Sequence, residues 1–362
     1  VIFHKHRIAS HFVVDRHKQL SCYIDRASQP TYTSNMSREL YPEIVFDDTI
    51  EPDFEEVDDA IQAVADACDG WGTDEDGLIE CLATKTPEER YKIYYRYEAL
   101  REENLSDRID NECGEGNFGR AMELLSLPPD LAEAKMIKLA CSGAGTEENV
   151  LYPLILGRSN REIEQLKKAY YKKYEEDLGS KLSGELSGKF EKLIFYALQG
   201  MEQEYDPEFH TEEKAEADAD AFYEAGQGSW GTDEGEIFEL LCASPPEHLM
   251  AMEEKYMEKY ESSMSRALKK EMSGTLEDAT VYLLGMKMNP SDHAASIIHE
   301  ACAGWGTEDL LLTTSLIRFH QILGPVAERY EMMYEQTLYD RVDGETSGNY
   351  GQMLCKLVES SA

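Results

Sequence analysis

Apolar residues recur at the helical period along much of the chain. Phe190, Leu193, Ile194, Ala197 and Leu198 follow the i, i+3, i+4, i+7, i+8 spacing that places side chains on one face of a helix. No stretch shows the sustained alternation of apolar and polar residues that is typical of half-buried strands. The pattern therefore predicts an all-α fold built from several short helices.

A tetrad of the form G-x-G-T occurs four times, with Ser in place of the first Gly in the third copy. The copies are Gly70-Trp71-Gly72-Thr73, Gly143-Ala144-Gly145-Thr146, Ser229-Trp230-Gly231-Thr232 and Gly304-Trp305-Gly306-Thr307. Intervals of 73, 86 and 75 residues separate the last Gly of successive copies. An acidic residue follows that Gly by 40 positions at Glu112, Glu185 and Glu271, and by 39 at Glu345. These coincidences indicate a four-fold internal repeat.

Helix starts also recur from repeat to repeat. Thr86-Pro87-Glu88-Glu89 combines an N-cap Thr, a Pro at the first helical position and a Glu three residues after the cap. Ser159-Asn160-Arg161-Glu162 and Ser244-Pro245-Pro246-Glu247 stand at the matching places in the next two repeats. We therefore expect helices to begin after Thr86, Ser159 and Ser244.

The repeats suggest boundaries, although the pattern leaves open whether the four units form an open solenoid or close on themselves. The expected divisions are an N-terminal tail (1–52), repeat 1 (53–126), repeat 2 (127–200), an acidic linker (201–211), repeat 3 (212–287) and repeat 4 (288–362).

The charge balance limits the partners. With 35 Lys and Arg against 72 Asp and Glu, the 362-residue chain carries a formal charge of −37, which argues against nucleic acid and against unaided binding to anionic lipid. The first 50 residues are chemically distinct, because their basic and acidic residues balance. The eight Cys are dispersed, which does not fit a disulfide framework or a zinc site.

Location is also suggested by the apolar pattern. No apolar run is long enough to span a membrane, and the opening segment carries charged residues and His where a signal peptide would be apolar. We expect a cytoplasmic protein that associates with membranes peripherally when calcium is present.

The tetrads suggest a calcium site. Their glycines permit positive φ, which allows successive carbonyl groups to turn toward one point. Calcium binds six to eight oxygens, often including a bidentate carboxylate, and the distant Glu could supply that carboxylate. The alternative is a plain turn in which Thr73 or Thr307 only caps the next helix.

All three Trp residues, Trp71, Trp230 and Trp305, directly precede the last Gly of a tetrad. Trp favours the membrane interface, where its ring is in an apolar layer and its N–H remains hydrated. We expect these side chains to contact the membrane, the alternative being a place in the core. A calcium ion at the contact would reverse the repulsion between acidic protein and acidic lipid.

The tetrads, their spacing and the distant acidic residues resemble the annexins, from about Asp53 to the C-terminus. The resemblance implies four repeats of about five helices each, in a slightly curved disc whose convex face carries the calcium loops and binds acidic phospholipid. One departure is the absence of the family's basic residue before the first Gly, where Asp69, Ser142 and Ala303 stand instead.

The resemblance also implies a ligand set, in which each loop supplies backbone carbonyls and each distant Glu supplies its side chain. The residues are Cys68, Gly70, Gly72 and Glu112; Cys141, Gly143, Gly145 and Glu185; Gly226, Ser229, Gly231 and Glu271; and Cys302, Gly304, Gly306 and Glu345.

The predicted function is calcium-dependent binding to acidic phospholipid membranes, for membrane organisation, vesicle contact or repair, with Ca²⁺ as the only cofactor and without catalysis. The alternatives are an enzyme acting on phospholipid, for which no catalytic motif is found, and a calcium-regulated protein scaffold. The tail is expected to support self-association or to dock a protein partner.

Overall fold

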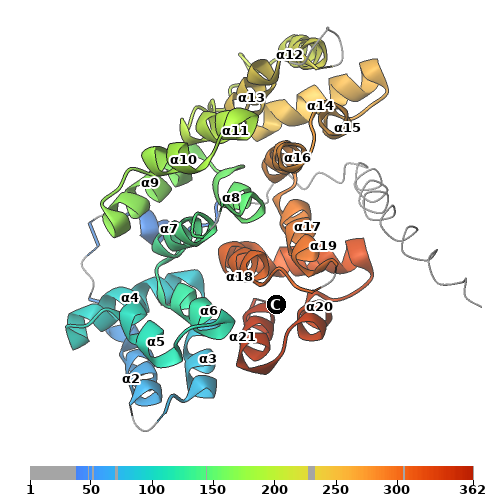
Figure 1. Ribbon diagram of the computed structural model, residues 1–362. Coiled ribbons are helices and arrows are strands. Elements are labelled where there is room, and N and C mark those ends of the chain that lie inside the picture. Colours follow the sequence, from blue (N-terminus) through green and yellow to red (C-terminus); the bar gives the residue numbers. More distant parts are fainter. Residues whose placement is uncertain are drawn as a thin grey trace, which may run out of the picture. The chain divides into compact units, whose positions relative to one another are not determined.

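The computed structural model describes residues 38–47, 49–50, 53–69, 72–143, 145–226, 233–304 and 306–361. All of these residues lie within the unit Ser37–Ala362. They form helices joined by loops, with no strand among them, which confirms the expected all-α class (Figure 1). None of the helices in this part of the chain has both the length and the apolar character needed to cross a bilayer.

Each of the first two repeats contains five α-helices, as the resemblance implied. Those of the first repeat are α2 (Asp58–Cys68), α3 (Glu75–Ala83), α4 (Pro87–Arg101), α5 (Leu105–Cys113) and α6 (Asn117–Ser126). Those of the second repeat are α7 (Pro129–Ala140), α8 (Glu148–Ile155), α9 (Asn160–Tyr174), α10 (Leu178–Glu185) and α11 (Gly188–Leu198).

The last two repeats also contain five α-helices each. The third contains α12 (Glu212–Ala225), α13 (Glu234–Ala243), α14 (Pro246–Tyr260), α15 (Met264–Glu271) and α16 (Thr275–Met288). The fourth contains α17 (Pro290–Cys302), α18 (Asp309–Arg318), α19 (Leu323–Tyr334), α20 (Leu338–Glu345) and α21 (Gly348–Glu359).

The described residues also form three short 3₁₀ helices, which are η1 (Glu43–Phe46), η2 (Glu55–Val57) and η3 (Phe319–Ile322).

Two of the three expected N-caps are confirmed. Thr86 forms a complete capping box with Glu89, and the Ser159 hydroxyl accepts a hydrogen bond from the Glu162 N–H at 3.3 Å. The expectation for Ser244 is wrong, because α14 begins one residue later, after Pro245. Pro246 takes the first helical position, where its fixed φ fits and its missing N–H costs nothing.

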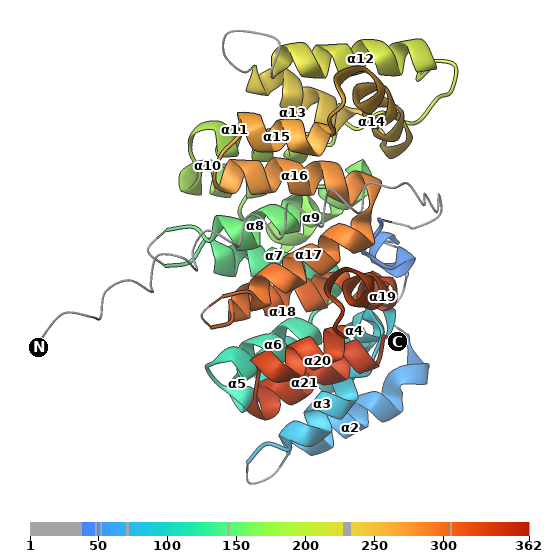
Figure 2. The ribbon, with the colours of Figure 1, turned by 90° about the vertical axis from the view of Figure 1, so that its right-hand side faces the viewer.

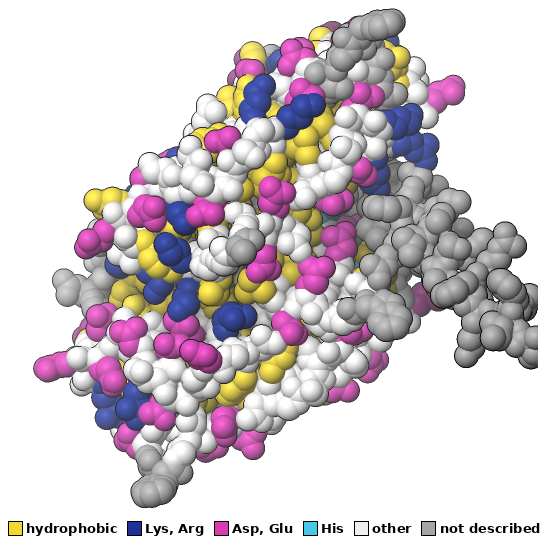
Figure 3. Space-filling view, in the orientation of Figure 1, with side chains coloured by type: hydrophobic (Ala, Val, Ile, Leu, Met, Phe, Trp, Pro, Cys, Tyr) yellow, Lys and Arg dark blue, Asp and Glu magenta, His cyan; other side chains and the backbone are white. Residues whose placement is uncertain are grey.

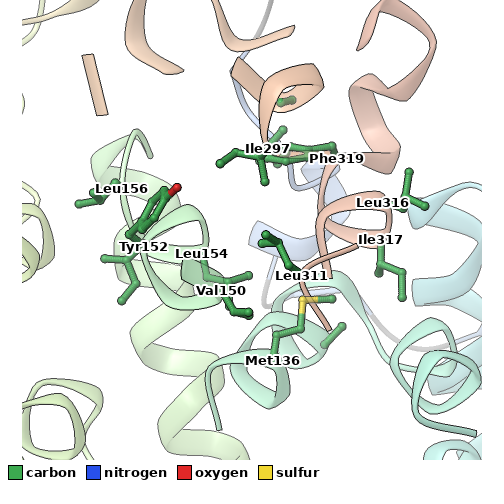
Figure 4. Close-up of a cluster of buried hydrophobic side chains, with 14 of the residues drawn as sticks. Met136, Val150, Tyr152, Leu154, Leu156, Ile297, Leu311, Leu316, Ile317 and Phe319 are labelled. Atoms are coloured by element: carbon green, nitrogen blue, oxygen red, sulfur yellow. The ribbon is translucent and has the colours of Figure 1, made fainter. Parts of the chain in front are cut away.

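The repeats close on one another rather than extending as an open solenoid. Helices α3 and α6 of the first repeat pack against α21 and α18 of the fourth, and the Ser360 hydroxyl donates to the Ala83 carbonyl at 2.9 Å. Helix α8 of the second repeat contacts both α16 and α18. Figure 4 shows part of the resulting core, where apolar side chains of α7 and α8 lie near those of α17 and α18.

A buried ionic network lies where the second and fourth repeats meet. The carboxylate of Glu133 accepts hydrogen bonds from Arg158, from Arg318 Nη1 at 2.8 Å and from the Tyr41 hydroxyl at 2.6 Å. Arg158 Nη1 also donates to Glu162 at 3.1 Å, and Glu162 accepts the Tyr41 N–H at 3.0 Å. The network thus ties the segment before η1 to two repeats.

Four glutamates end the third helix of the repeats in a left-handed conformation that favours glycine. They are Glu102 (φ 54°), Glu175 (φ 53°), Glu261 (φ 51°) and Glu335 (φ 55°), the C-caps of α4, α9, α14 and α19. Such a conformation costs an L-residue about 1–2 kcal/mol. A carboxylate at this end of a helix also opposes the macrodipole.

Replacing any of these residues by Gly, for example Glu175→Gly, is expected to raise the free energy of unfolding by about 1 kcal/mol. Urea unfolding followed by circular dichroism measures this change. Glu164→Gly is the matched control, since Glu164 is exposed inside the same helix and its loss should lower stability by about 1 kcal/mol. Destabilisation by both changes would contradict the conformational argument.

Candidate functional site

The distant acidic residue comes back to its tetrad in three repeats, where the Thr hydroxyl of the tetrad donates to it. The distances from Thr Oγ1 to Glu Oε2 are 3.2 Å for Thr73 and Glu112, 3.3 Å for Thr146 and Glu185, and 3.2 Å for Thr307 and Glu345. The same hydroxyls also point at the backbone carbonyls of these Glu residues. The carboxylates are partly exposed, between 22% and 26%, and so remain accessible from solvent.

These contacts rule out the plain-turn interpretation of Thr73 and Thr307. The N-cap of α3 is Asp74, whose side chain accepts from the Gly77 N–H at 3.0 Å, and the N-cap of α18 is Glu308. Each Thr therefore hydrogen-bonds to the acidic residue at the end of the fourth helix of its repeat and does not cap the second helix.

A backbone hydrogen bond closes the loop in all four repeats. The residue after the tetrad donates its N–H to an Ala carbonyl in the last turn of the preceding helix. The pairs are Asp74 and Ala67 (3.0 Å), Glu147 and Ala140 (2.8 Å), Asp233 and Ala225 (2.7 Å), and Glu308 and Ala301 (2.8 Å). The third loop encloses one residue more than the others, in agreement with its variant sequence.

The expected carbonyl ligands stand at helix C-termini. Cys68 and Cys302 are the last residues of α2 and α17, and Cys141 is the C-cap of α7. Carbonyl groups in the last turn have no partner within the helix and carry the negative end of its dipole. They are therefore suited to a hard cation. In Figure 2, α2, α12 and α17 end toward the same side of the picture.

The tetrad glycines adopt the expected positive φ wherever they are described. Gly143 and Gly145 have φ values of 109° and 116°, and a Cβ added at either would meet no atom within 4 Å. Glycine is therefore required at these positions for the backbone conformation and not for space.

The third loop is described only in part. Gly226 is the C-cap of α12, and a Cβ placed on it would lie 3.3 Å from the Glu271 Cγ, so this Glu also reaches its loop. Six of the predicted ligand and membrane-contact residues lie outside the described residues: Gly70, Trp71, Ser229, Trp230, Gly231 and Trp305. The membrane contact of the three Trp side chains therefore stays a prediction.

Two irregular repeats keep the same contact. In the first repeat the extra residue is absorbed after Glu112, where Gly114 (φ 67°) and Gly116 (φ 121°) join α5 to α6. In the fourth repeat the shorter interval coincides with η3 and with an α19 of 12 residues, against 15 in α4, α9 and α14. Neither change separates the acidic residue from its Thr.

A basic side chain four positions before the acidic residue contacts that residue in three repeats, and the sequence reasoning missed it. Arg108 Nη2 lies 2.8 Å from the Cys68 carbonyl oxygen and 3.1 Å from Glu112 Oε1. Arg341 donates to the Cys302 carbonyl and lies 3.1 Å from Glu345 Oε1. The recurrence of Arg or Lys at this position in three repeats was the available sequence signal.

In the second repeat the corresponding residue is Lys181, whose Nζ lies 2.5 Å from Glu185 Oε1. This hydrogen bond lowers the pKa of the Glu185 carboxyl and raises the pKa of Lys181. A cationic nitrogen is thus held by an oxygen of the carboxylate that the sequence predicts as a metal ligand. A carboxylate that already pairs with a cation is chemically suited to a hard metal ion.

The described residues contain no metal site made of side chains alone. No group of three or more His, Cys, Asp or Glu side chains in this part of the chain is placed to hold a metal ion. A site made mainly of carbonyl oxygens does not need one. The described cysteines are free, and burial raises the pKa of Cys141 to about 11.

Comparison with known proteins agrees with this arrangement. A model of the Annexin family matches residues 58–125, 132–196, 217–283 and 292–357. The chain is 31% identical over 298 residues to annexin A3 of Mus musculus, covering 82% of this chain and 91% of that protein. It is 30% identical over 309 residues to annexin A6 of Gallus gallus, covering 85% of this chain and 46% of that protein, so it spans about half of that relative.

Among solved structures, annexin III aligns with a TM-score of 0.77 and 28% identity, covering 90% of this chain and 98% of that one. Each of the four matched ranges contains both a tetrad and the acidic residue 39 or 40 positions after its last Gly. The chain therefore belongs to the annexin family, whose members bind phospholipid in a calcium-dependent manner.

Proposed function

We propose that this chain binds acidic phospholipid membranes peripherally through calcium ions held in its four loops. The observation that carries the proposal is the return of a carboxylate to each loop. It is seen as a Thr–Glu contact in the first, second and fourth repeats, and as the approach of Glu271 to Gly226 in the third repeat. Calcium binds carbonyl and carboxylate oxygens at roughly 2.3–2.6 Å, and its remaining positions are open to water or to a lipid phosphate oxygen.

The proposed ligands are the loop carbonyls together with one carboxylate per loop. They are Cys68, Gly70, Gly72 and Glu112; Cys141, Gly143, Gly145 and Glu185; Gly226, Ser229, Gly231 and Glu271; and Cys302, Gly304, Gly306 and Glu345. A bound ion would bridge protein and lipid and would supply the positive charge that the surface lacks.

The surface supports a requirement for calcium. The chain carries a formal charge of −37, and an acidic membrane repels it unless cations intervene. Figure 3 shows Lys and Arg side chains interspersed with Asp and Glu over the face that it presents, without a continuous basic surface. Calcium would therefore be part of the contact itself.

Trp71, Trp230 and Trp305 are proposed to enter the interfacial layer of the membrane beside the ions, because each belongs to a tetrad. Indole rings favour this layer, where the ring is shielded and the N–H remains hydrated. Their fluorescence provides a label-free readout of contact.

We expect the protein to sediment with phosphatidylserine-containing liposomes in calcium and to be released by a chelator. Trp emission should shift to the blue when calcium and liposomes are both present. Neutral phosphatidylcholine liposomes are the control. Undiminished sedimentation in excess chelator would contradict the proposal, because it would show binding without the ion.

The finer points of the proposal concern organisation. We propose repeat boundaries at 53–126, 127–200, 212–287 and 288–362, an acidic linker at 201–211, and a non-catalytic role in membrane organisation, vesicle contact or repair. The tail, 1–52, is proposed to support self-association or partner docking, and most of it lies outside the described residues.

A further inference from the structure

One atom of Arg108 stands among the oxygens of the first loop. Its Nη2 lies 2.8 Å from the Cys68 carbonyl oxygen, 3.1 Å from Glu112 Oε1 and 3.3 Å from Asp69 Oδ1. Two of these three oxygens belong to the proposed calcium ligands. The guanidinium nitrogen thus contacts the same oxygens that are proposed to bind the calcium ion.

The arrangement recurs in full in the fourth loop, and its contact with the acidic residue recurs in the second loop. Arg341 bonds both the Cys302 carbonyl and Glu345, and Lys181 bonds Glu185. In the third repeat the corresponding position is Ala267. The contacts in the first, second and fourth loops are charge-assisted hydrogen bonds, which are among the stronger ones in proteins.

Calcium and these nitrogens compete for the same oxygens. A calcium ion needs the carbonyl and carboxylate oxygens at roughly 2.3–2.6 Å. This leaves no room for Arg108 or Arg341, which contact both kinds of oxygen. It also leaves no room for the Lys181 amine on the Glu185 carboxylate. A calcium ion and a basic side chain that contact the same oxygens would also repel each other, because both are positively charged. Binding of the ion therefore requires the basic side chain to leave.

We propose that Arg108, Lys181 and Arg341 are internal counter-cations that hold their loops closed without calcium and raise the calcium concentration needed to fill them. The inference rests on the proposed function, because it assumes that the loops bind calcium. The three side chains are between 17% and 27% exposed, so each lies at the surface and can turn into solvent when the ion enters. The structure thus indicates an exchange of one cation for another.

Isothermal titration of the full chain with CaCl₂, without lipid, tests the exchange. Arg108→Gln, Lys181→Gln and Arg341→Gln should each lower the half-saturating calcium concentration of one loop several-fold. The triple variant should also sediment with phosphatidylserine liposomes at several-fold lower calcium than the unmodified chain. Circular dichroism checks that the helices are retained.

Lys138→Gln is the matched control at the second loop. Lys138 is in the last turn of α7, where its amine lies 3.9 Å from Glu176 and over the Tyr174 ring, and among the described residues it has no bond to Glu185 or to a loop carbonyl. The Lys138→Gln variant removes one positive charge near the second loop, as Lys181→Gln does, and should change calcium affinity much less. An equal gain from both variants would overturn the exchange in favour of a general field effect.

Arg108→Lys keeps the charge but shortens the reach, and it serves as a second variant if Arg108→Gln does not fold. It should bind calcium more tightly than the unmodified chain and less tightly than Arg108→Gln. Unchanged or weaker calcium binding by all the folded variants would overturn the inference while leaving the proposed function intact. Failure of the unmodified chain to bind calcium would overturn both.

Discussion

Replacing the four acidic residues together, as Glu112→Gln, Glu185→Gln, Glu271→Gln and Glu345→Gln, is expected to abolish calcium-dependent sedimentation with acidic liposomes. Each loop would keep its carbonyl groups but would lose its full negative charge and its bidentate ligand. Calcium affinity should fall roughly tenfold or more at each loop, because such sites are tuned by the number of charged ligands. Titration calorimetry and sedimentation across a calcium series measure both effects.

The fold should tolerate these changes. Gln has the shape of Glu, and its amide oxygen can still accept the hydrogen bond from the tetrad Thr. Single variants should each weaken calcium binding at one loop, and their effects on membrane binding should accumulate.

A matched control removes the same charge from exposed glutamates away from the loops, one in each repeat. These are Glu88→Gln, Glu164→Gln, Glu258→Gln and Glu331→Gln. This variant should bind liposomes at unchanged or slightly lower calcium, because it weakens the repulsion between protein and membrane. If the loop variant sediments like the control, the four carboxylates are not calcium ligands.

The sequence was most informative where a feature repeats at fixed spacing. The return of Glu112 to Thr73 joins residues far apart in the chain, yet it could be predicted because the same interval occurs in other repeats. The apolar stripe of α11 was likewise readable, and Phe190, Leu193 and Ile194 are buried as predicted. Periodicity reports which face of a helix is buried, whatever packs against it.

Features that depend on neighbours in space were not readable. The left-handed φ of Glu102 and its counterparts has no local signal, since glutamate normally avoids this conformation. Ser is a residue type that favours the N-cap, so Ser244 was expected to precede the helix. Two successive prolines follow it, and α14 begins at the second of them, Pro246. The Arg108 contact is an intermediate case: the recurrence of a basic residue four positions before the acidic one was visible, but its carbonyl partner at the end of α2 is known only from the folded chain.

The buried network is the clearest case of a feature outside the reach of sequence patterns. Glu133, Arg158 and Arg318 come from α7, the loop after α8, and α18, and none of them stands out by spacing. Each side chain is at most 3% exposed. A buried charge is tolerated only when opposite charges and hydrogen bonds satisfy it, so the three residues depend on one another.

Glu133→Gln is expected to lower the free energy of unfolding by about 3–5 kcal/mol, the cost of leaving a buried charge without its partner. The two guanidinium groups would lose the carboxylate they share, and the new amide would direct N–H donors toward other donors. Burial already lowers the pKa of Arg158, which shows how unfavourable its charged form would be there without nearby acids. Urea unfolding at constant calcium and pH measures the loss.

Two controls separate the network from simpler causes. Tyr41→Phe removes one hydroxyl from Glu133 and keeps every charge, so it should cost about 1 kcal/mol. Glu88→Gln breaks an exposed pair with Lys92, 3.0 Å apart, and should cost about 0–1 kcal/mol. A loss for Glu133→Gln no larger than that for Glu88→Gln would mean that Arg158 and Arg318 find other partners. In that case Glu162, which already bonds Arg158 at 3.1 Å, would be the carboxylate that takes over.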